Sequence, residues 1–133
     1  VIFLDKNDQK ININEFKGNF LILNFWAVWC EPCKEEMPSL DKLQANPELD
    51  KIKIFPINIG KETSNKVNKF FIDLNIKNFE PYFDPPTTLA KMFSLRGVPT
   101  SILINKDGQE FARILGSIDF EDKIFVSWIK KYN

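Results

Sequence analysis

The chain has 133 residues, 44% of them hydrophobic and 14% aromatic, which is enough to build the core of one domain over residues 1–133. Its 18 basic and 18 acidic side chains cancel, so no nucleic-acid partner is expected, and no apolar run reaches the ~20 residues of a membrane span. The sequence has no histidine, which excludes Cys-His and Ser-His hydrolases and histidine-based metal sites.

The first half of the chain predicts a hairpin, two further strands and a helix. Apolar stretches at 1–5 and 10–13 surround a polar turn, as in a β-hairpin. The continuous apolar run at 19–29 predicts a strand buried on both faces. Helical spacing over 30–45 predicts a helix that Pro38 should kink. The run 51–59 is a strand candidate, and Pro56 in its middle requires a bulge there.

The second half predicts three helices and a hairpin. Thr63 or Ser64 caps an amphipathic helix whose apolar face carries Val67, Phe70, Phe71 and Leu74. Asp84 with Pro85 or Pro86 opens a shorter helix that carries Leu89, Met92 and Phe93. Residues 99–105 and 109–115 flank a Lys-Asp-Gly turn and form the hairpin. A closing helix places on one face Phe120, Ile124, Phe125 and Trp128.

This order of elements predicts an α/β fold with a mixed central sheet and helices on both of its faces. The predicted elements also include a hairpin at the N-terminus and, in the middle of the chain, a helical insertion around residues 60–80 that follows the β-α-β unit.

The only two cysteines, Cys30 and Cys33, are separated by Glu31 and Pro32. A disulfide between them closes too short a loop to stabilise the chain much, and a closed zinc site needs about four ligands, so structural and metal roles are the weaker interpretations. A strand followed by Cys-x-x-Cys and a helix instead places Cys30 at a helix N-terminus, where a thiolate is stabilised.

The expected chemistry is thiol–disulfide exchange. Cys30 attacks a target disulfide, and Cys33, one turn further and shielded, resolves the mixed disulfide. Pro32 fits the first helical turn. Glu31 beside Cys30 opposes thiolate formation and favours the disulfide form, or is simply a solvated carboxylate at a helix N-terminus.

The stretch "NFWAVWCEPCKEEMP" together with the later "RGVPT" resembles thioredoxin-fold thiol–disulfide oxidoreductases of the TlpA/ResA-like branch, which includes the cytochrome-c-biogenesis reductases. The resemblance covers essentially the whole chain and implies a thioredoxin-like fold. It makes Cys30 the attacking thiol and Cys33 the resolving thiol. It also implies that Pro99 is cis and packs on the cysteine pair.

The resemblance further assigns substrate contacts. Val98 matches the residue whose backbone pairs with a substrate peptide, and Trp29 matches the aromatic side chain beside the active site. Glu31 and Pro32 complete the expected substrate-contacting set, together with Pro99. Trp26 is instead expected in the core.

One departure from thioredoxin itself concerns proton transfer. Asn24 stands where thioredoxin has a buried Asp that serves the resolving cysteine. Glu36 is the replacement, because it lies three residues after Cys33 on the same helix face and matches a Glu of the TlpA/ResA-like branch. Burial should raise the pKa of Glu36 and suit it to exchange a proton with Cys33; otherwise it is a solvated helix residue.

The leading functional prediction is an extracytoplasmic reductase of protein disulfides, with no cofactor or metal. The resemblance implies substrates such as apocytochrome c or the copper-centre proteins of cytochrome oxidase, and a membrane protein that supplies electrons. It also implies a periplasmic or other extracytoplasmic location, tethered to the membrane by an N-terminal segment. We expect a monomer.

Three alternatives are weighed against it. A disulfide oxidase or isomerase of this fold favours a His between the cysteines. A thiol peroxidase carries a Thr where this chain has Ala27. A Cu(I) metallochaperone would use the two soft thiolates, but the chain has neither His nor a Met-rich tract.

Overall fold

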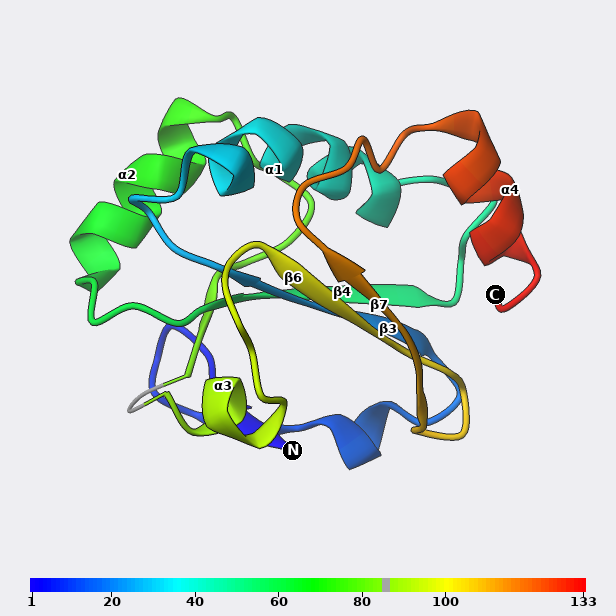
Figure 1. Cartoon of the computed structure of the whole chain (residues 1–133), viewed down its shortest axis with the longest axis horizontal. Coiled ribbons are helices and arrows are strands. Elements are labelled where there is room, and N and C mark those ends of the chain that lie inside the picture. Colours follow the sequence, from blue (N-terminus) through cyan, green and yellow to red (C-terminus); the bar gives the residue numbers. More distant parts are fainter. Residues whose placement is uncertain (85–86) are drawn as a thin grey trace.

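The computed structural model describes residues 1–84 and 87–133, which form a mixed sheet in the strand order β2-β1-β5-β4-β3-β6-β7 (Figure 1). The strands are β1 (Ile2–Leu4), β2 (Lys10–Asn12), β3 (Phe20–Trp26), β4 (Ile52–Asn58), β5 (Tyr82–Phe83), β6 (Thr100–Ile104) and β7 (Glu110–Leu115). The helices are α1 (Glu31–Gln44), α2 (Ser64–Asp73), α3 (Thr88–Met92) and α4 (Lys123–Lys130), with a 3-10 helix η1 (Ile13–Phe16). The predicted α/β architecture is confirmed.

Strand β3 lies inside the sheet, between β4 and β6, and all seven of its residues are buried. It runs parallel to β4 on one side and antiparallel to β6 on the other. A strand covered on both faces has no solvent side to alternate with, which explains its continuous apolar sequence. The carboxyl end of β3 leads directly to the two cysteines.

Pro56 lies in the middle of β4 without a bulge, contrary to the prediction. The β3–β4 register runs without a shift from Phe20↔Ile52 to Trp26↔Asn58. The N–H of Ile54 points away from β3 and donates to the Gln44 side chain at 2.7 Å. The backbone N–H groups of a strand point alternately to its two sides, so the nitrogen of Pro56 points to the same side as that of Ile54, away from β3. On that side, β5 pairs only with Ile57 and Asn58. The missing N–H therefore breaks no bond to β3.

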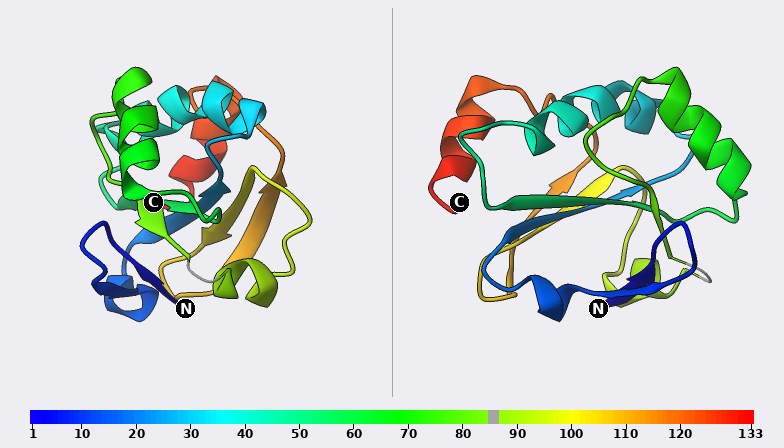
Figure 2. Two further views of the ribbon diagram at one scale, coloured as in Figure 1. Left: turned by 90° about the vertical axis from the view of Figure 1, so that its left-hand side faces the viewer. Right: turned by 180° about the vertical axis from the view of Figure 1, so that it is seen from behind.

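The helices divide between the two faces of the sheet (Figures 1 and 2). Helices α1, α2 and α4 cover one face, over a core that includes Trp26, Met37 and Phe120. Helix α3 and η1 lie on the other face, over a core that includes Phe3, Phe25 and Phe55. Among the described residues, no helix combines the length and apolarity needed to cross a membrane.

Both predicted hairpins are confirmed, as β1–β2 and β6–β7. The sequence did not indicate β5, whose two residues are too few to show a period. This short strand pairs in parallel with β4 and in antiparallel with β1, so it joins the N-terminal hairpin to the sheet.

The two middle helices follow their predicted caps. Thr63 caps α2 by accepting a hydrogen bond from the Lys66 N–H. Asp84 accepts the N–H groups of Leu89 and Ala90 at 2.9 and 3.0 Å, so it does hold the start of α3. The prediction that Pro85 or Pro86 helps to open this helix concerns residues outside those that the structure describes.

The prediction for the closing helix is partly wrong. Ile124 is 81% exposed, and Phe120 is buried in the turn before the helix. The reason is the cap: the Asp122 side chain accepts the Phe125 N–H and starts the helix at Lys123. With the helix starting at Lys123, Ile129 lies on the side that faces the core and is fully buried, whereas Ile124 faces solvent.

Candidate active site

Cys30 is the N-cap residue of α1, and a disulfide joins it to Cys33. The Cys33 N–H donates to the Cys30 Sγ at 3.2 Å, and the Lys34 N–H donates to the Cys30 carbonyl at 3.2 Å. The Cys33 N–H at the helix N-terminus thus points at Cys30 Sγ, an arrangement that stabilises a thiolate once the disulfide is reduced. Pro32 lies in the first turn of the helix, as predicted.

The two sulfur-bearing residues differ in their surroundings. Cys33 is completely buried in the core beneath α1, whereas Cys30 retains 4% exposure at the surface. Of the two residues, only Cys30 reaches the surface, which fits an attacking thiol at Cys30 and a resolving thiol at Cys33.

The loop before β6 lies against the cysteine pair, as the resemblance implied. The Val98–Pro99 peptide bond is cis, and the Val98 carbonyl oxygen lies 3.6 Å from Cys30 Sγ. The Pro99 carbonyl accepts the N–H of Gly116 from the end of β7 at 2.9 Å. The fold thus brings residues of β3, α1 and the loop before β6 to one place.

The two tryptophans near the cysteines have opposite environments. Trp29 is 72% exposed beside Cys30, and Glu31 is also exposed. Trp26 is fully buried, with its ring 4.6 Å from that of Phe70 and 5.5 Å from that of Phe71. The core position of Trp26 is confirmed, and an exposed indole next to Cys30 leaves Trp29 free to contact a substrate.

Glu36 is buried, with only 2% exposure. Its Oε1 accepts from Asn24 Nδ2 at 2.9 Å, and its Oε2 accepts from the Ile118 N–H at 3.3 Å. Burial raises the pKa of Glu36 from 4.5 to about 7, although these two hydrogen bonds act in the opposite direction. The expected burial and raised pKa are therefore found.

A hollow of about 300 Å³ adjoins Glu36 and opens toward solvent. Its other lining residues are Glu35, Ser39, Ser117, Ile118 and Asp119. Glu36 thus lies between the helix face that carries Cys33 and a polar route along which a proton can leave.

Two contributors to this site were missed by sequence reasoning. The carboxylate of Glu62 accepts the N–H of Val28 in the loop before Cys30, and Ser101 accepts a hydrogen bond from Asn24. Neither side chain shares a motif or a helix turn with its partner, so nothing local in the sequence indicates the contact.

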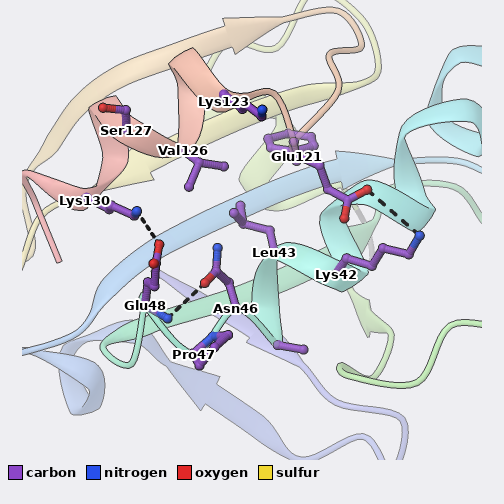
Figure 3. Close-up of a pocket in the computed structure, with 12 residues that line it drawn as sticks. Lys42, Leu43, Asn46, Pro47, Glu48, Glu121, Lys123, Val126, Ser127 and Lys130 are labelled. Carbon is purple, nitrogen blue, oxygen red and sulfur yellow. Dashed lines mark hydrogen bonds and ion pairs between the residues drawn. The ribbon is translucent and has the colours of Figure 1, made fainter.

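A larger pocket of about 490 Å³ lies between the end of α1 and α4 (Figure 3). Four of its charged side chains form ion pairs, Lys42 with Glu121 and Lys130 with Glu48. None of the predicted site residues lines it. In the part of the chain that the structure describes, no three Cys, Asp or Glu side chains gather as metal ligands.

Comparisons with known proteins agree with this geometry. The model of the AhpC/TSA family matches residues 3–109. The thiol-disulfide oxidoreductase ResA of Bacillus cereus is 32% identical over 115 residues, which make up 86% of this chain and 65% of ResA. The chain therefore spans slightly less than two thirds of the length of that relative.

Solved structures confirm the thioredoxin-like fold. The crystal structure of StoA from Bacillus subtilis is 25% identical, with a TM-score of 0.76 over 99% of this chain and 94% of that one. The thioredoxin domain of a thiol-disulfide oxidoreductase from Bacteroides vulgatus is 18% identical, with a TM-score of 0.80 over 100% and 93%. The matches to ResA and StoA agree with the resemblance to the TlpA/ResA-like branch, and the Bacteroides vulgatus structure shows the fold alone.

Proposed function

Because this chain belongs to the AhpC/TSA family, we propose that it is a thiol–disulfide oxidoreductase that reduces protein disulfides through Cys30 and Cys33. The observation that carries the proposal is the placement of this cysteine pair at the N-terminus of α1, against the cis Val98–Pro99 loop. The similarity to ResA supports it.

The reaction starts from the dithiol. The Cys30 thiolate attacks one sulfur of the substrate disulfide, and the other substrate sulfur leaves and takes up a proton. Cys33 then gives its proton to Glu36, and its thiolate attacks Cys30 Sγ. The second substrate sulfur leaves as a thiolate that takes up a proton from solvent, and the Cys30–Cys33 disulfide of the structure is formed. A separate dithiol donor must then return two electrons and two protons.

Glu36 is the proton acceptor in this scheme. Its pKa of about 7 matches a group that takes and releases a proton near neutral pH. The adjoining hollow carries that proton to solvent. Trp29, Glu31 and Pro32 border the exposed side of Cys30, and the backbone of Val98 with Pro99 forms the opposite wall for a substrate peptide.

The substrates, location and donor are extensions of the same proposal. We place the protein outside the cytoplasm, tethered to the membrane, with apocytochrome c or copper-centre proteins as substrates and a membrane protein as electron donor. These assignments follow from the TlpA/ResA-like resemblance. Copper titration of the reduced protein tests the metallochaperone alternative, for which stoichiometric tight binding is the required result.

Trapping tests the roles of the two cysteines. A Cys33→Ser variant should accumulate a mixed disulfide with a disulfide-bearing peptide, since resolution is blocked, and a Cys30→Ser variant should form none. The unmodified protein is the control, because its Cys33 resolves the mixed disulfide and none should accumulate. If both serine variants formed the mixed disulfide equally well, the assignment of Cys30 as the attacking thiol and Cys33 as the resolving thiol would be wrong.

The reduction potential decides the direction of electron flow. Equilibration with a dithiothreitol or glutathione series should give a value near or below roughly −220 mV for a reductant. A value near about −120 mV would make the protein an oxidase.

A further inference from the structure

Three buried polar side chains from three elements meet beside the cysteine pair. Asn24 of β3 donates from Nδ2 to Glu36 Oε1 of α1 at 2.9 Å and to Ser101 Oγ of β6 at 3.0 Å. The exposed fractions are 0% for Asn24, 2% for Glu36 and 1% for Ser101. Among the described residues, Asn24 Oδ1 has no hydrogen-bond partner. The amide therefore uses both of its donor hydrogens and neither lone pair of its oxygen.

This arrangement suits only the carboxylate form of Glu36. A carboxylate accepts hydrogen bonds, whereas a carboxylic acid must also donate one. The Ile118 N–H donates to Oε2 at 3.3 Å, so that oxygen stays an acceptor and the acid proton belongs on Oε1. Oε1 faces Asn24 Nδ2, which is itself a donor, so the acid form would place two donors against each other.

We propose that Asn24 and Ser101 form a reversible hydrogen-bond pair that positions Glu36 in both of its protonation states, by rotation of the Asn24 amide about its Cβ–Cγ bond. In the carboxylate state Nδ2 donates to Glu36 and to Ser101. In the acid state Oδ1 takes its place and accepts from both, since the Ser101 hydroxyl can donate as well as accept.

The charged surroundings of Glu36 make both states accessible. On α1, Cys33 is a buried residue one helical turn before Glu36, and Glu35 lines the same hollow as Glu36, as does Asp119 from the loop before α4. From β3 and β6 Glu36 faces the neutral Asn24 and Ser101. The hollow contains no cation among its described lining residues, so no ion pair there favours the charged form of Glu36. Burial raises the pKa of Glu36 to about 7, while the hydrogen bonds from Asn24 and Ile118 act in the opposite direction.

The inference rests on the proposed function only for its purpose, which is to give the Glu36 carboxyl a hydrogen-bond partner while it holds the proton taken from Cys33. Without the rotation, protonation would set the acid proton of Glu36 against the Asn24 NH₂ group. With it, the acid proton gains an acceptor, and the NH₂ group moves to the place where Oδ1 has no hydrogen-bond partner among the described residues. The amide itself can be observed in the oxidised protein, where no thiol chemistry takes place, so failure of the inference and failure of the reductase activity give separate results.

The experiment is a pH titration of the oxidised protein by NMR, from pH 5 to 9, with ¹⁵N in the Asn side chains and ¹³C in the Glu carboxyls. We expect the Asn24 NH₂ resonances to shift with one midpoint, shared with the Glu36 carboxyl carbon. At low pH the NH₂ group should take up the shifts of an amide without a hydrogen-bond acceptor.

Glu36→Gln provides the decisive variant. In this variant the Ile118 N–H still needs an acceptor, so the side-chain oxygen of the introduced Gln should take the position of Oε2. Its NH₂ group then faces Asn24 and donates to it, as the acid form of Glu36 would. The Asn24 resonances should then stay at their low-pH positions throughout, whereas Glu35→Gln, which keeps Glu36 and its bond to Asn24, should retain one midpoint shared by Asn24 and Glu36. Asn24 resonances that ignore the Glu36 midpoint, or that remain at the high-pH positions in Glu36→Gln, would overturn the inference.

Discussion

The Glu62 carboxylate accepts the backbone N–H of Val28 with both oxygens, at 2.9 and 3.2 Å, although 34 residues separate the two in the sequence. Glu62 Oε1 also accepts from Asn58 Nδ2 at 2.8 Å, at the end of β4. The loop that carries Trp29 and Cys30 is thus anchored to the neighbouring strand. Its position depends on a residue of the segment between β4 and α2.

Glu62→Ala should therefore lower the free energy of unfolding by about 2 kcal/mol, since it removes a charged acceptor from a half-buried N–H. Glu62→Gln should lose less, because one oxygen remains for Val28. Urea unfolding of both variants measures this. The control is Glu80→Ala, whose exposed ion pair with Lys6 at 3.3 Å should contribute no more than about 1 kcal/mol. Equal losses in Glu62→Ala and Glu80→Ala would contradict the anchoring role.

Glu36 should make stability depend on pH. Its pKa in the folded state is about 7, against 4.5 ordinarily, so between these values the folded protein binds more protons than the unfolded chain. The stability it contributes is present in full below pH 4.5 and is lost as the pH rises through about 7, by up to about 3 kcal/mol.

Urea unfolding of the oxidised protein at several pH values, with Glu36→Gln beside it, checks this dependence. The variant should gain in stability relative to wild type as the pH rises from 5 to 8. Glu35→Gln should follow wild type, because Glu35 is exposed. A constant difference between Glu36→Gln and wild type across this range would show that Glu36 does not titrate there.

The two neighbouring tryptophans should respond oppositely to truncation. Trp26→Ala removes a fully buried ring packed on Phe70 and Phe71, and should cost about 3–5 kcal/mol of unfolding free energy. Trp29→Ala removes a ring that is 72% exposed and should change stability by less than about 0.5 kcal/mol. In an insulin-reduction assay of the folded molecules, Trp29→Ala should have the larger effect of the two variants and should raise the KM. An unchanged KM would remove Trp29 from the substrate contacts.

Gly116 should tolerate no side chain without strain. Its φ is +90°, and its N–H bonds to the Pro99 carbonyl, so Gly116→Ala should destabilise the protein by about 1 kcal/mol or more. Gly97→Ala is the matched control near the same loop, because an added Cβ there meets nothing within 4 Å and Gly97 has no positive φ. Thermal unfolding compares them, and a Gly97→Ala loss as large as that of Gly116→Ala would refute the argument from φ.

Local patterns in the sequence determined much of this protein. The uninterrupted apolar run fixed β3 as a doubly covered strand, and the spacing of Val67, Phe70 and Phe71 predicted α2. The order of strand, cysteine pair and helix placed Cys30 at the start of α1. Each of these depends on neighbours within two helical turns, where period and capping act.

Tertiary structure alone decided the rest. Strand β5 exists because β4 and β1 flank it, and Pro56 fits β4 because its nitrogen faces the side away from β3. The bonds of Glu62 to Val28 and of Asn24 to Ser101 join residues whose separation in sequence is 34 and 77. Such contacts depend on the register and packing of distant strands, which no local period encodes, and it is these contacts that hold Cys30 and Glu36 in place.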